Sequence, residues 1–309
     1  AYGFIKIKSV DSRLADWSNI KVAVAQGNID QSVKWDPAFR QETIDIYREL
    51  SLKGADEKPE LIIWPESAVP FYLSYENKAA ALISGVAEDT GAYLLTGSPH
   101  FEDNTPGSSE WESYFNSAFL LSPEGETLDR YDKVKLVPFG EYVPLKRALF
   151  FIKKLTVGFA DFTPGPGHMP LEMKAVRLGV LICFESIFPG ISASTVRNGA
   201  SVLLVLTNDG WFGKTSAAYQ HFDMAILRAV ENRTSLVRAA NRGISGVIDP
   251  LGRVTHETGL LTREYFVADI KMRDARETKS FFTLYGRYFP IVLILFFLFF
   301  MPLKINDRR

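Results

Sequence analysis

Short apolar runs alternate with longer segments of helical character along much of this chain. Continuous or alternating apolar residues over four to eight positions are typical of strands, and wider apolar spacing is typical of helices. The predicted strands cover residues 21–26, 61–64, 93–97, 117–121, 127–131, 175–183, 201–207, 235–239, 245–249 and 265–270. The predicted helices cover residues 37–52, 77–89, 191–198 and 217–232. This order predicts an α/β fold with mixed sheets in one domain.

The predicted strand 175–183 ends abruptly in Cys183, the only cysteine of the chain. A cysteine at a strand-to-helix turn can expose its sulfur, and the amides of the following turn favour the thiolate. A single cysteine is more often a small buried apolar residue. This stretch alone therefore does not choose between a nucleophile and a core residue.

Two further polar residues stand at the ends of strand-like segments. Glu66 directly follows Trp64-Pro65 at the end of an apolar strand, where a glutamate is unusual; a solvated loop carboxylate is the ordinary alternative. Lys133 and Lys135 are two positions apart, so they point to the same face and the spacing does not choose between them. An ordinary pair of surface lysines would look the same in the sequence.

The C-terminal end differs in kind from the rest of the chain. Every residue from 289 to 301 is apolar, and extension to 281–303 reaches the length that a membrane-spanning helix needs. A buried core helix is rarely apolar all round and so rich in phenylalanine. We predict a transmembrane helix over 281–303 and a tail over 304–309. Basic residues flank the segment on both sides, so charge does not give its orientation.

Composition narrows the possible function classes. A chain of 309 residues that is 47% hydrophobic can bury a sizeable core, and its net charge of −1 argues against a nucleic-acid partner. One cysteine cannot form an internal disulfide and says nothing of the compartment. The chain starts with Ala1, which suggests a processed form or a fragment, and residues 1–20 are expected to link it to a preceding region. We found no metal-ligand spacing and no phosphate loop.

Three separate motifs together resemble the nitrilase superfamily, whose members combine a glutamate, a lysine and a cysteine. These motifs are Trp64-Pro65-Glu66, Tyr131-Asp132-Lys133 with Leu136 to Glu141, and Cys183-Phe184-Glu185. More narrowly, the chain resembles the catalytic domain of the apolipoprotein N-acyltransferases. That second resemblance is carried by residues 26–28, 34–36, 136–141, 207–213, 220–221, 228–231 and 241–245. Phe184 departs from the family, which commonly has tyrosine at this position.

The resemblance implies a four-layer αββα sandwich over residues 21–275. It also implies a place at the bacterial inner membrane, with the domain facing the periplasm after a membrane domain that this sequence lacks. It gives a catalytic role to Glu66, Lys133 and Cys183, with no cofactor and no metal. Because a thiol with a pKa near 8.5 is mostly protonated at neutral pH, Cys183 needs a base, which Glu66 would be.

The remaining site residues follow from the same resemblance. Lys133 and the amide of Phe184 would hold the oxyanion, and Glu141 would keep that lysine charged and oriented. Trp35 and Glu185 are expected in the substrate-facing shell. His221 receives no role and is expected to be a structural histidine.

The resemblance predicts an acyltransferase that takes an acyl chain from a phospholipid onto Cys183. It then passes the chain to the N-terminal cysteine amine of a diacylglyceryl apolipoprotein. Two alternatives stay open: a nitrilase-type amidase that hydrolyses a small amide, and a membrane-tethered binding protein that has lost activity. The hydrophobic C-terminal segment argues against the first alternative, and the three intact residues argue against the second.

Residues 145–155 form a separate candidate for membrane contact. Four basic residues would lie opposite an apolar stripe on a helix, which predicts an interfacial helix on an anionic bilayer. An ordinary amphipathic core helix is the alternative for this segment.

Overall fold

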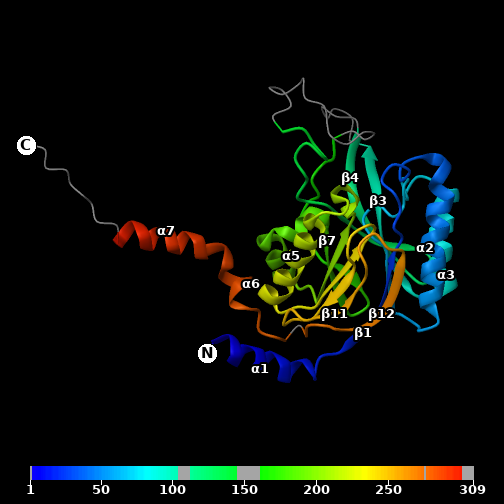
Figure 1. Cartoon of the computed structure of the whole chain (residues 1–309). Coiled ribbons are helices and arrows are strands. Elements are labelled where there is room, and N and C mark those ends of the chain that lie inside the picture. The colour runs from blue at the N-terminus through cyan, green and yellow to red at the C-terminus, as the bar shows by residue number, and fades with distance from the viewer. Residues whose placement is uncertain (1, 104–111, 145–160, 275, 301–309) are drawn as a thin grey trace, which may run out of the picture.

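The computed structural model describes residues 2–103, 112–144, 161–274 and 276–300 of the chain. Two six-stranded sheets pack against each other, and helices cover their outer faces (Figure 1). The strands are β1 (Asn19–Gln26), β2 (Leu61–Ile63), β3 (Tyr93–Asp103), β4 (Glu112–Leu121), β5 (Thr127–Asp132), β6 (Leu171–Met173), β7 (Val176–Ile182), β8 (Val202–Thr207), β9 (Leu236–Ala240), β10 (Gly246–Ile248), β11 (Val254–Glu257) and β12 (Glu264–Lys271).

Each sheet mixes parallel and antiparallel pairs. The first has the order β12-β1-β2-β3-β4-β5 and the second the order β11-β10-β9-β8-β7-β6. The α-helices are α1 (Tyr2–Leu14), α2 (Arg40–Ala55), α3 (Asn77–Thr90), α4 (Pro189–Arg197), α5 (Ser216–Asn232), α6 (Phe281–Tyr285) and α7 (Phe289–Phe300). Short 3₁₀ helices are η1 (Pro37–Phe39), η2 (Cys183–Ile187), η3 (Asp209–Phe212) and η4 (Gly286–Tyr288).

Alternation along the strands builds three stacked cores. In β1, Val22 and Val24 point into the core between the sheets, whereas Ala23 and Ala25 point outward to the core under α2 and α3. The second sheet does the same, with its outer core under α4 and α5. Because both faces of each sheet are covered, the central strands are apolar at nearly every position. The structure thus confirms the predicted four-layer αββα sandwich.

The first 20 residues depart from the expected weakly patterned linker, because residues 2–14 form the helix α1. Val10, Leu14 and Trp17 are buried together against Leu251. These three residues form a single narrow apolar stripe of about two turns. Apolar side chains earlier in the helix, such as Phe4, are exposed, so the apolar positions of this segment do not follow a helical period in the sequence.

Strand β6 was also missed by the sequence analysis, because its three residues are too few to show a period. The predicted interfacial helix over 145–155 lies outside the described residues. At the other end, α6, η4 and α7 together give one helical segment, Phe281–Phe300, that is long and apolar enough to cross a membrane. Its apolar side chains are largely exposed, as Phe299 is at 82%.

Candidate active site

Glu66 enters the space between the two sheets from the turn that follows β2. Gly97 on β3 allows this turn, because a Cβ at that position would lie 2.4 Å from the backbone nitrogen of Ser67. Glu66 is buried, with 8% of the residue exposed. Its Oε1 accepts a hydrogen bond from Asn116 Nδ2 at 2.8 Å, and its Oε2 accepts one from the backbone amide of Asn208 at 3.0 Å. Both oxygens are thereby held in place as acceptors.

Lys133 follows the last residue of β5 and reaches the same space. Its Nζ lies 2.8 Å from Glu141 Oε1 and 3.6 Å from Glu66 Oε1. Burial acts to lower the pKa of Lys133, but the two carboxylates outweigh it and hold that pKa well above its ordinary value. Lys135 is exposed and places its ammonium over the ring of Phe188. The structure therefore distinguishes the two lysines that the spacing left equivalent.

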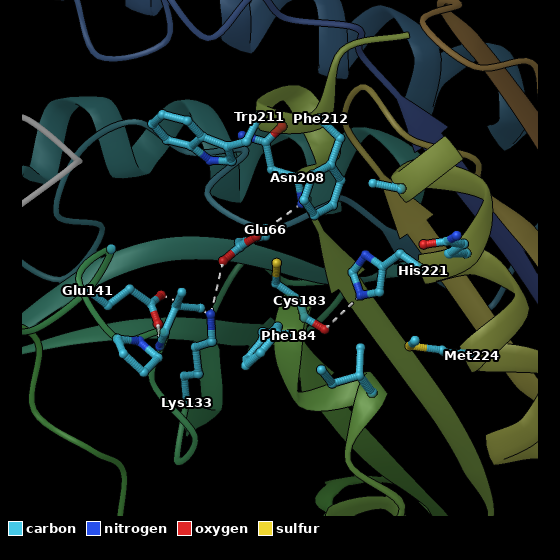
Figure 2. Close-up of a pocket in the computed structure, with 16 residues that line it drawn as sticks. Glu66, Lys133, Glu141, Cys183, Phe184, Asn208, Trp211, Phe212, His221 and Met224 are labelled. Atoms are coloured by element: carbon cyan, nitrogen blue, oxygen red, sulfur yellow. Dashed lines mark hydrogen bonds and ion pairs between the residues drawn. The ribbon is translucent and has the colours of Figure 1, made fainter. Parts of the chain in front are cut away.

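Cys183 begins η2 directly after β7 and has a φ of +52°, a left-handed conformation that is costly for a residue with a Cβ. Burial raises the pKa of its thiol to about 12; nearby Glu66 adds to the rise, while Lys133 and a hydrogen bond from Thr207 oppose it. The resting group is thus a thiol. Figure 2 shows it close to Glu66 and Lys133, which come from the other sheet.

These side chains line a cavity of about 510 Å³. Glu66, Lys133 and Glu141 form its charged side. Much of the remaining wall is apolar and comes from the segment after Lys133, from η2, η3 and α5; it includes Val137, Phe184, Ile187, Trp211, Phe212 and Met224. A thiol, a carboxylate and an ammonium that meet in such a cavity can carry out nucleophilic acyl transfer.

The sequence profile of the carbon-nitrogen hydrolase family matches residues 21–280. The chain belongs to this family. The match spans both sheets, and it confirms the resemblance to the nitrilase superfamily that the three motifs indicated.

Curated relatives within the carbon-nitrogen hydrolases give a narrower likeness. An apolipoprotein N-acyltransferase of Geobacter metallireducens is 44% identical over 290 residues, which cover 94% of this chain and 54% of the relative. The corresponding enzyme of Agrobacterium fabrum is 39% identical over 82% of this chain and 48% of its own length. The chain thus spans about half the length of the curated relatives it matches.

Solved structures agree on the fold. An amidase from Nesterenkonia sp. is similar with a TM-score of 0.61 at 22% identity, over 88% of this chain and 97% of that one. A mutant of that amidase carries the acetamide moiety of fluoroacetamide on its active-site cysteine; its TM-score is 0.59 at 23% identity, over 82% and 91% of the two chains. At this identity the likeness concerns the fold alone.

The expected position of Glu185 needs correction, because its side chain does not face the cavity. It is completely buried behind the wall. The carboxylate accepts hydrogen bonds from the hydroxyl of Tyr131 and from the backbone amides of Val134, Lys135 and Ile182. Glu185 thus ties the segment after Lys133 to β7, the strand that directly precedes Cys183. The family motif identified this residue, but only the packing of the two sheets reveals which way it points.

The other predicted residues differ in their positions. Phe184 lines the cavity, and its ring packs edge-to-face on Phe188 at 5.1 Å between centroids. Glu141 accepts the hydrogen bond from Lys133, as its expected supporting role requires. Trp35 is half-buried and is not among the described residues that line the cavity, so its contact with substrate stays a prediction.

Sequence reasoning missed Lys34, a second buried cation of the site. Its side chain is 3% exposed, and its Nζ donates to the backbone carbonyl of Glu66 at 3.1 Å. Burial lowers the pKa of Lys34 to about 8, although Glu66 and Cys183 act in the opposite direction. Lys133 pairs with the carboxylates of Glu66 and Glu141, whereas Lys34 contacts the backbone of Glu66. Its place beside Trp35 in the motif was the only available signal.

Among the described ranges, no group of three or more histidine, cysteine, aspartate or glutamate side chains is arranged to hold a metal ion. The expectation that the site works without metal or cofactor remains a prediction.

Proposed function

We propose that this chain is the catalytic part of an apolipoprotein N-acyltransferase. The observation that carries the proposal is the half-buried thiol of Cys183 beside Glu66 and Lys133, in a cavity whose remaining wall is largely apolar. Such a wall suits a long acyl chain better than a small polar amide. The names of the relatives at 38–44% identity support the same conclusion.

In the first half-reaction, Cys183 attacks the ester carbonyl of a phospholipid acyl chain. Glu66 takes the thiol proton as the sulfur–carbon bond forms, because burial keeps this thiol protonated at rest. Lys133 and the amide of Phe184 stabilise the oxyanion. The glyceryl oxygen then leaves with the proton that Glu66 returns. A lysophospholipid departs, and the acyl chain stays on Cys183 as a thioester.

In the second half-reaction, the N-terminal cysteine amine of a diacylglyceryl apolipoprotein attacks the thioester. Glu66 accepts the amine proton and passes it to the sulfur of Cys183 as the carbon–sulfur bond breaks. The products are an amide-linked acyl chain and the free thiol, so Glu66 and Cys183 return to their starting states. Neither half-reaction consumes water, a metal or a cofactor.

The proposal places the chain at the bacterial inner membrane with its catalytic domain in the periplasm, and Phe281–Phe300 as the span. Helix α5 supports this arrangement, because it forms part of the cavity wall through Met224 and holds α6 at its other end. There the Thr283 hydroxyl donates to Asn232 Oδ1 at 2.9 Å. The cavity and the start of the span are thus joined through one helix of 17 residues.

The proposal is tested by incubating the membrane-embedded protein with phospholipid vesicles and measuring its mass. We expect an added acyl chain that maps to Cys183 and that neutral hydroxylamine removes, as it does thioesters. A protein that stays unmodified, while its thiol still reacts with iodoacetamide, would favour the binding protein that has lost activity.

The acceptor separates a transferase from an amidase, because both form a thioester. We expect the loaded enzyme to be stable in buffer and to discharge quickly when a diacylated lipopeptide with a free amine is added. Rapid decay in buffer that the lipopeptide does not accelerate would favour the amidase. A lipopeptide with an acetylated N-terminus is the matched control.

A further inference from the structure

His221 on α5 lines the cavity beside the nucleophile, and Figure 2 marks the contact of its ring with the backbone oxygen of Cys183. Its Nε2 is 3.3 Å from the carbonyl oxygen of Cys183 and 2.9 Å from the hydroxyl oxygen of Ser186. The Ser186 hydroxyl itself donates to the same carbonyl at 2.8 Å. The imidazole therefore supports the Cys183 carbonyl directly and also through Ser186.

The other side of the ring is held by a buried ion pair. Nδ1 of His221 lies 2.9 Å from Asp209 Oδ1, and the other oxygen of Asp209 accepts a hydrogen bond from Arg238 at 2.5 Å. Asp209 is 1% exposed and Arg238 is completely buried. Burial alone would raise the pKa of Asp209, but Arg238 and His221 hold it well below its usual range. Nδ1 thus faces the Asp209 carboxylate, with Arg238 Nη2 at 3.2 Å on the same side, whereas Nε2 faces the Cys183 carbonyl, which can only accept a hydrogen bond.

This support acts where the backbone is least favourable. Cys183 has a φ of +52°, which a residue with a Cβ adopts only when its surroundings hold it there. A contact that holds the carbonyl restricts the backbone of Cys183. It thereby restricts the direction of the Cα–Cβ bond, which carries the sulfur.

We infer that His221 is a positioning residue that keeps Cys183 in its catalytic backbone conformation, with Asp209 and Arg238 fixing the ring. The inference rests on the proposed role of Cys183 as the nucleophile, but it concerns a residue outside the Glu66, Lys133 and Cys183 set. It replaces the expectation that this histidine is only structural.

Two substitutions separate the two sides of the ring. In His221→Gln, the amide nitrogen can take the place of Nε2 and still donate to Cys183, whereas the shorter amide of His221→Asn reaches only the place of Nδ1 near Asp209. We expect His221→Asn to slow acyl-enzyme formation by about tenfold or more, and His221→Gln by about threefold or less. Alkylation of Cys183 by iodoacetamide should show the same order, and it needs no lipid.

The control is His256→Asn on β11, where the histidine contacts Thr255 and stacks on Phe266. It should leave the rates of acyl-enzyme formation and of alkylation unchanged.

Equal rates for the two His221 variants would overturn the inference. So would rate losses that merely parallel the fall in melting temperature of the variants. If His221→Asn does not fold, Ser186→Ala removes the second donor to the carbonyl; a normal alkylation rate in that variant would equally argue against it. Failure of acyl transfer in wild type, with the alkylation order intact, would instead reject only the proposed function.

Discussion

The two sides of the cavity differ in how their side chains are held. On the side of the first sheet, Glu66 and Lys133 are buried and joined through hydrogen bonds and ion pairs. On the side of the second sheet, Trp211 is 58% exposed and Met224 is 38% exposed, and both present apolar surface. Proton transfer requires groups at fixed distances, whereas a flexible acyl chain requires an apolar surface that excludes water. Changes to the polar groups of the first side should therefore alter the rate with any acyl donor, and changes to the exposed apolar side chains of the second should alter affinity for lipid.

The largest effect is expected at Cys183, where the two sides meet. Cys183→Ser barely changes the volume, but an alkoxide is far harder to generate than a thiolate, so we expect no detectable acyl-enzyme. Intact-protein mass spectrometry after incubation with vesicles measures this, and circular dichroism checks that the fold is kept. Turnover comparable to wild type would show that Cys183 is not the nucleophile.

The second largest effect is expected for Glu66→Gln, which should lower the rates of both half-reactions by about 10³-fold, because the amide cannot accept a proton. The same substitution should raise the rate at which iodoacetamide alkylates Cys183. The carboxylate of Glu66 raises the pKa of Cys183, so its removal should lower that pKa and raise the thiolate fraction at a given pH. Rates with iodoacetamide between pH 7 and 9 measure this difference. An acyl-enzyme that forms at a near-normal rate would mean that another base exists.

Lys133→Ala should slow acyl-enzyme formation by about 10²-fold or more, the scale of one lost oxyanion donor. Lys135→Ala is the matched control, because that lysine is two residues away and exposed, and we expect little change. Single-turnover thioester formation compares the two variants. Equal losses would mean that the oxyanion is held elsewhere.

Lys34→Met should reduce the rate by about tenfold, because it removes a buried donor to the Glu66 backbone. Lys53→Met, on the exposed face of α2, is the control.

The pKa of Lys34 is lowered to about 8 in the fold, so above pH 8 the unfolded chain binds this proton more tightly than the native one. The free energy of unfolding of wild type should thus rise relative to Lys34→Met between pH 8 and 10.5. The absence of any such rise would contradict the burial of a charged Lys34.

The smallest effect is expected for a substitution in the apolar wall of the cavity. Trp211→Ser should raise the KM for vesicular phospholipid by about threefold to tenfold, since less apolar surface is left to contact the chain. The kcat and the iodoacetamide rate should stay unchanged. Leu128→Ser removes a similarly exposed apolar side chain on β5 and serves as control. A fall in kcat without a change in KM would remove the distinction between the two sides.

Much of the architecture could be predicted from the sequence, because local patterns record which faces of an element are covered. The apolar runs at β2 and β8 predict buried strands, and the C-terminal apolar run predicts the helical segment that the structure shows over Phe281–Phe300. The motif residues Glu66, Lys133 and Cys183 were named in advance by resemblance, and the structure brings them to one cavity.

Only the tertiary structure decided how polar groups are buried and which way they point. The contacts of Lys34 with Glu66, of Asn208 with Glu66 and of Tyr131 with Glu185 join residues that are 32, 142 and 54 positions apart. No local period records such pairs, because a lysine or a glutamate looks the same in the sequence whether it is solvated or buried with a partner. Burial of a charge is favourable only once the partner is in place, and the packing of the two sheets provides that partner.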